Sequence, residues 1–146
     1  MPNEAKSYEA AGGYGNYVLY RMCADEPEHG DIAIVQSKAR TIAKVYEVSR
    51  NLGRNYTRIA KVFCGKKLAL DTLLDDLGQK AFCEAALPAI IDVHRKVDQA
   101  LCKKLAAKSG GRGVHSRASF VSKYLHFHRP DTFPILDSIA EKEEGR

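Results

Sequence analysis

Apolar residues recur at steps of three and four along most of the chain, the spacing that places side chains on one face of a helix. The longest such run follows Asp31, a good helix N-cap, and is predicted to end at Gly53. Its polar face is basic, and we interpret those charges as solvated rather than as a phosphate-binding track. The core-facing positions are Ile32, Val35, Ala39, Ile42, Ala43 and Tyr46, and the basic ones are Lys38, Arg40, Lys44 and Arg50.

The rest of the pattern also predicts helices, separated by glycine, proline and polar turns. No stretch alternates apolar and polar residues over a useful length, so strands are not predicted. The expected fold is all-α, a compact single-domain helical bundle over residues 16–146 after a flexible tail at 1–15. The further helices are predicted from Tyr17 to about Glu26, from Asn55 to Gly65, within 68–78, from Pro88 to about 108–111, from Ser116 or Ser119 to Arg129, and from Ser138 onward.

Length and composition fit one domain and set loose limits on partners. The 146 residues, 45% of them hydrophobic, can bury one core, and the net charge of +5 permits an acidic partner without requiring one. The apolar stretches are shorter than the roughly 20 residues that cross a bilayer, and the first residues lack the features of a secretory signal. We therefore expect a cytoplasmic protein with no membrane partner.

Few residues outside the C-terminal region suggest chemistry. The cysteines, Cys23, Cys64, Cys83 and Cys102, occur singly and are interpreted as buried reduced thiols, with Cys102 beside Lys103 and Lys104 the one weak candidate for a reactive thiolate. Asp71, Asp75 and Asp76 are interpreted as a solvated acidic face, and His94 as a core or boundary residue. No metal and no cofactor are expected.

The order of elements between Leu105 and Ile139 is typical of a helix-hairpin-helix element followed by an aspartate. A helix leads into the glycine-rich "SGGRGVHS", a second helix follows, and "PDTFPI" is predicted to be extended before the acid Asp137 and a capped helix. In such an element glycines let backbone N–H groups approach a phosphate closely. The predicted nucleic-acid contacts are Gly111, Arg112, Gly113, His115, Arg117 and Arg129.

The stretch "SKYLHFHRPDTFPILDS" resembles small bacterial proteins described as 8-oxoguanine-glycosylase-like, which are distant relatives of the helix-hairpin-helix DNA glycosylases. "YGNYVLYRMC" and "DVHRK" extend the resemblance over most of the chain. The resemblance implies that Asp137 is the catalytic acid, stabilising positive charge on the sugar of an extruded base and helping to activate water or an amine. It also implies a base pocket, to which we assign Tyr124, His126 and His128.

The chain departs from this family at two points. Arg117 occupies the place of the lysine nucleophile of bifunctional glycosylases, and a guanidinium stays protonated. Lys123, the nearest lysine on that helix, is about six residues further on and is kept as a second catalytic candidate. "GGRG" carries an arginine where an apolar residue is expected. If the protein is an enzyme, these departures favour a monofunctional DNA N-glycosylase-like hydrolase.

Structural roles compete with these functional ones. Asp137 could serve only as a helix cap before Ser138. His126 and His128 flank Phe127 and point about 200° apart on a helix, so they are not expected to share a metal; one is predicted to face the pocket or the core and the other solvent.

Three functions follow as hypotheses. The first is a DNA-binding, glycosylase-like protein in base excision. The second is a catalytically inactive protein-interaction module, such as an accessory or inhibitor protein of a mobile element or defence locus, with a protein partner. The third is a hydrolase that uses Asp137 with His126 or His128.

Overall fold

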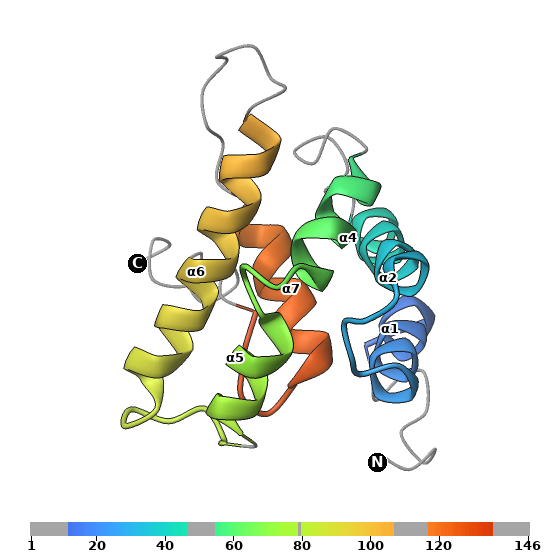
Figure 1. Ribbon diagram of the computed structural model, residues 1–146. Coiled ribbons are helices and arrows are strands. Elements are labelled where there is room, and N and C mark those ends of the chain that lie inside the picture. Colours follow the sequence, from blue (N-terminus) through green and yellow to red (C-terminus); the bar gives the residue numbers. More distant parts are fainter. Residues whose placement is uncertain (1–11, 47–54, 79, 107–116, 136–146) are drawn as a thin grey trace, which may run out of the picture.

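The computed structural model describes residues 12–46, 55–78, 80–106 and 117–135, and this part of the chain contains six helices and no strand. The all-α prediction is confirmed (Figure 1). None of the described helices is both long enough and apolar enough to span a bilayer. The helices are α1 (Tyr14–Asp25), α2 (Ile32–Val45), α4 (Tyr56–Cys64), α5 (Leu70–Leu77), α6 (Leu87–Ala106) and α7 (Ala118–His128).

Helix α7 is the centre of the bundle. It packs against α1 and α2 on one side and against α6 on the other (Figure 1). A helix surrounded in this way must bury its whole circumference, and α7 does so with polar as well as apolar residues. Its buried residues are Phe120, Val121, Ser122, Lys123, Tyr124, Leu125, Phe127 and His128.

Several helix ends lie where the sequence predicts them. The Asp31 carboxylate accepts hydrogen bonds from the backbone N–H groups of Ala33 (2.9 Å) and Ile34 (3.3 Å), which confirms it as the N-cap of α2. Gly65 and Gly78 end α4 and α5, and Pro88 stands in the first turn of α6. These ends depend on local backbone preferences, which a single sequence shows directly.

Other boundaries differ from the prediction. Helix α1 begins at Tyr14, so Tyr14 and Gly15 of the predicted tail are helical. A Cβ at Gly15 would lie 3.0 Å from a methyl group of Val45, so α1 and α2 approach closely there. Helix α2 ends at Val45, well before Gly53.

The start of α7 and the segment after it also differ. Arg117 holds the N-cap position of α7, where Ser116 or Ser119 was predicted, and its backbone N–H donates to the carboxylate of Asp98 on α6 (2.9 Å). Residues 130–132 form a turn rather than an extended segment, because the Thr132 and Phe133 N–H groups donate to the Arg129 carbonyl (3.0 and 2.9 Å). The predicted hairpin at 107–116 and the helix at Ser138 lie outside the described residues.

Candidate functional site

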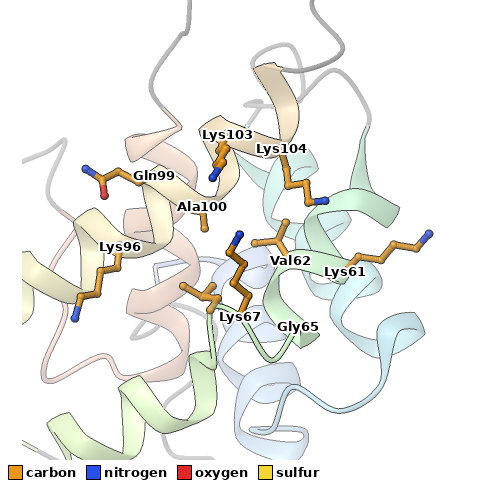
Figure 2. Close-up of a pocket in the computed structure, with 10 residues that line it drawn as sticks. Lys61, Val62, Gly65, Lys67, Lys96, Gln99, Ala100, Lys103 and Lys104 are labelled. Atoms are coloured by element: carbon orange, nitrogen blue, oxygen red, sulfur yellow. The ribbon is translucent and has the colours of Figure 1, made fainter.

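A groove of about 670 Å³ runs between α4 and α6 and is lined by five lysines (Figure 2). We call it the lysine groove. All five lysines are exposed, and no acidic residue is among the ten that line it. Its lining consists of Lys61, Val62, Gly65, Lys67, Leu68, Lys96, Gln99, Ala100, Lys103 and Lys104.

The helical period of α6 places three of the lysines on one face. Lys103 and Lys104 follow Lys96 by seven and eight residues, or about two turns, so the three share one side of α6. At 1.5 Å per residue the row is about 10 to 12 Å long. Gln99 and Ala100 lie between the lysines on the same face.

The opposite wall depends on a tight turn after α4. A Cβ at Gly65 would lie 3.0 Å from the carbonyl oxygen of Lys61, which leaves no room for a side chain there. The turn is closed by the Ala69 N–H, which donates to the Gly65 carbonyl (3.1 Å). Figure 2 shows Lys67 extending from this turn into the space between α4 and α6, whereas the end of Lys61 projects outward.

Positive charge in the groove is largely uncompensated within the described part of the chain. Lys96 pairs with Asp92 at 2.9 Å, but no carboxylate of that part pairs with the other four lysines. A further cation stands at the end of the groove, where the Arg58 guanidinium donates to the Lys104 carbonyl (3.3 Å). The groove therefore suits an anion that brings several negative charges.

A second group of polar side chains is buried beside α7. His29, in the turn before α2, bonds through Nδ1 and through its backbone N–H to the two carboxylate oxygens of Asp71 (2.7 and 2.8 Å). Its Nε2 lies 2.8 Å from the hydroxyl of Tyr124 on α7. The sequence predicts a solvated Asp71, but its side chain is only part-exposed and joins α5 to the His29 turn.

Lys38 is buried, although the sequence places it on the solvated face of α2. It is 0% exposed, and its ammonium group donates to the Glu26 carbonyl and to Nε2 of His128. His128 Nδ1 lies 3.0 Å from the Tyr124 carbonyl. Because Nε2 accepts from Lys38, the remaining proton of neutral His128 sits on Nδ1 and is donated to that carbonyl.

Burial determines the protonation of this polar cluster. It lowers the pKa values of His29 and Lys38 and brings that of His128 well below 6.5. Burial alone would raise the pKa of Asp71, but hydrogen bonds from His29 outweigh it and the pKa lies below its usual value. His29 is thus neutral near pH 7, donating from Nδ1 to ionised Asp71 and accepting at Nε2 from the tyrosine.

The order Asp71, His29, Tyr124 places a carboxylate, an imidazole and a hydroxyl in series, as in sites that activate a nucleophile. However, Tyr124 is 0% exposed, and burial holds the pKa of its hydroxyl well above 10. No substrate can reach this hydroxyl in the structure. We therefore assign the cluster a structural role, holding α2, α5 and the His29 turn to α7.

The pocket residues predicted from the sequence prove to be packed residues. Tyr124 and His128 belong to the buried cluster. His126 is half-buried rather than exposed, with its ring nitrogens 2.6 Å from the Tyr20 hydroxyl and 2.8 Å from the Phe133 carbonyl. The prediction that one of the two histidines faces solvent is therefore wrong.

The basic candidates on and beside α7 do not line the groove. Lys123 is buried, donates to the Ser119 hydroxyl (2.8 Å) and lies over the Tyr46 ring (5.1 Å). Arg129 is 16% exposed and lies 3.9 Å from Asp75, while the Arg117 side chain is half-buried. Asp137 lies outside the described residues, together with Gly111, Arg112, Gly113 and His115.

The cysteines and His94 do not form a reactive centre. Cys102 is half-buried, and burial raises the pKa of its thiol, so the weak expectation of a thiolate finds no support. Burial likewise raises the pKa of Cys23 to about 12, whereas Cys83 is exposed and lies outside the helices, unlike the prediction. His94 is half-buried at the boundary, as expected. Within the described residues no three His, Cys, Asp or Glu side chains are grouped to hold a metal.

Comparison with known proteins returned no match: no family model, curated protein or solved structure resembles the chain significantly.

Proposed function

We propose that the protein binds nucleic acid and that the lysine groove contacts the phosphates. The observation that carries the proposal is that five exposed lysines, from α4, α6 and the turn between α4 and α5, line one groove whose lining contains no acid. Scattered surface lysines are common in proteins. A concave surface whose charges all have one sign concentrates the electrostatic field and, when the charges are positive, raises the local concentration of anions.

The groove chemistry suits a polyanion better than a small anion. Each lysine ends in a mobile point charge, without the fixed fork by which arginine grips a single carboxylate or phosphate. Lys96 and Lys104 lie about 12 Å apart along α6, farther than one phosphate group can bridge. Repeated phosphates along one strand can meet such a row one after another.

The position of α6 in the sequence links the groove to the predicted hairpin. Lys103 and Lys104 stand in the last turn of α6, and the chain continues directly into residues 107–117, which carry Arg112 and His115. The predicted phosphate contacts thus follow the α6 lysines of the groove directly in the sequence.

Two matched double variants test the groove. Lys103→Gln with Lys104→Gln removes two charges from it, and Lys44→Gln with Lys80→Gln removes two exposed charges from elsewhere. Binding of a labelled DNA is measured by fluorescence anisotropy between about 50 and 200 mM salt. The groove variant is expected to reduce the slope of log K against log salt by about two, and the control to leave it nearly unchanged.

Two outcomes would contradict the proposal. Equal losses in both variants would mean that net charge, and not the groove, determines binding. Failure to bind DNA or RNA at low salt, with lysine-dependent binding of poly-glutamate, would instead support the alternative of an acidic protein partner.

Base excision is a narrower part of the same proposal and rests on the resemblance and on Asp137. The intact protein should release a damaged base from DNA, and Asp137→Asn should abolish the release while leaving DNA affinity within about threefold. Absence of release from every lesion tested would reject base excision and leave nucleic-acid binding standing.

A further inference from the structure

We infer that the lysine groove binds the sugar–phosphate backbone alone and reads no base, so that its affinity follows phosphate density and not sequence. This inference rests on the proposed nucleic-acid binding and specifies what the groove recognises.

The lining lacks the side chains that hold unstacked bases. Proteins that bind single strands stack the bases on aromatic rings, and none of the ten lining residues is aromatic. Helix α4 has two aromatic residues, but both face the core: Tyr56 lies under Arg40, and the Phe63 ring packs 4.5 Å from that of Tyr124. An exposed base would find only aliphatic surface, from Val62, Leu68 and Ala100.

The shape of the surface also excludes reading of base edges. Base edges lie at the bottom of the grooves of a double helix, so a protein reads them with an element that projects into a groove. The lysine groove is concave and can receive only a ridge, and on a double helix the ridge is the backbone. Gln99 carries the one side-chain amide of the lining, the group that pairs with an adenine edge where an element projects into a DNA groove, so it is the residue that tests this exclusion.

The row of lysines on α6 sets the scale of the contact. From Lys96 to Lys103 is seven residues, or about 10 Å along α6. Lys67 faces this row from the opposite wall (Figure 2). One backbone strand lying between the two walls would meet about three ammonium groups, those of Lys67, Lys103 and Lys104. This count excludes Lys61, whose end projects outward, and Lys96, which pairs with Asp92.

Phosphate density then determines which nucleic acid binds best. A double helix carries about one charge per 1.7 Å and releases about 0.9 counterions per contacted phosphate, against about 0.7 for a single strand. For three contacts at about 50 mM salt this difference amounts to about sixfold in affinity. A site that stacked bases would give the opposite order.

The experiment compares three labelled DNA probes of equal length at about 50 mM salt: a G·C-rich duplex, an A·T-rich duplex and a single strand of mixed sequence. The two duplexes are expected to bind within about threefold of each other and the single strand about sixfold more weakly. Gln99→Ala is expected to leave the ratio of the two duplex affinities unchanged, because Gln99 reads no base. Lys103→Gln with Lys104→Gln serves as the control, since it should weaken all three.

Failure of this inference gives a different result from failure of the proposed nucleic-acid binding. Tighter binding of the single strand, or a preference above about tenfold between the duplexes that Gln99→Ala removes, would overturn the inference while nucleic-acid binding stood. Absence of binding to every probe would overturn the proposed function itself.

Discussion

The ammonium group of Lys38 lies 3.1 Å from Nε2 of His128, and both side chains are buried between α2 and α7. A charged lysine is seldom buried without partners, and here it has His128 and the Glu26 carbonyl. The contact therefore connects the end of α1, the middle of α2 and the end of α7 at the centre of the bundle.

Substitution of Lys38 tests whether this contact supports the fold. Lys38→Ala removes the donor to two buried acceptors and the aliphatic stem that fills the space around them. We expect a loss of about 3 to 5 kcal/mol in the free energy of unfolding, measured by urea denaturation. Lys44→Ala on the exposed face of the same helix should change it by about 0.5 kcal/mol or less. Similar small effects from both would show that Lys38 is solvated.

Asp71 is expected to contribute through its two hydrogen bonds from His29. Asp71→Ala leaves the His29 imidazole N–H and backbone N–H without their acceptor, which should cost about 1 to 3 kcal/mol of stability. Asp76→Ala, an exposed acid on the same helix, is the matched control and should be nearly neutral. Thermal or urea unfolding measures the stability of both variants. Equal losses from Asp71→Ala and Asp76→Ala would mean that Asp71 is solvated, as the sequence predicts.

The buried histidines make stability depend on pH. The pKa values of His29 and His128 lie below 6.5 in the folded protein because burial disfavours the charged imidazole. At pH values between these folded-state pKa values and 6.5, the unfolded chain binds more protons than the folded protein does. The free energy of unfolding should therefore fall as pH drops from 7 to 5. The pKa of Asp71 lies below 3.8, so protonation of this carboxylate lowers the free energy of unfolding further only at still lower pH.

Urea unfolding at several pH values between 7 and 5 measures this dependence. Replacing both histidines by glutamine, His29→Gln with His128→Gln, should flatten the curve even where it lowers the absolute stability. The same slope in both proteins would mean that these two histidines are not buried in neutral form.

Ala69 is the one non-glycine residue of the described chain with a left-handed backbone, at φ 51°. This conformation costs an L-residue roughly 1 to 2 kcal/mol. Glycine avoids that cost, but it loses more backbone entropy on folding, which offsets part of the gain. Ala69→Gly should therefore raise the free energy of unfolding by about 0.5 to 1 kcal/mol. Gly65→Ala should lower it, because its methyl group would meet the Lys61 carbonyl. If Ala69→Gly destabilised the protein, packing of the Ala69 methyl group would outweigh the backbone strain.

The local part of the fold could be predicted from the sequence. Asp31, Gly65, Gly78 and Pro88 act where their own backbone preferences apply, so the helix ends that they set were predicted correctly. The end of α2 was predicted wrongly. Gly53 marks only a place where a helix could end, and the chain already leaves the helix at Tyr46.

The site could not be predicted in the same way. The groove joins Lys61 and Lys67 to lysines of α6 about 30 residues or more further along the chain, and each group by itself has the pattern of a solvated face. Lys38 also follows a polar helical spacing; its burial depends on α7, some 90 residues away. His29 lies in a polar turn, and only the packing of α5 and α7 reveals its role.

Nucleic-acid binding by the lysine groove is tested most directly by the salt dependence of DNA binding by the intact protein and by the variant with Lys103→Gln and Lys104→Gln. We predict a slope of log K against log salt of about −3 to −5 for the intact protein, shallower by about two in the variant, with no change in stability. An identical slope for the two proteins would contradict it, because the lysine groove would then take no part in binding.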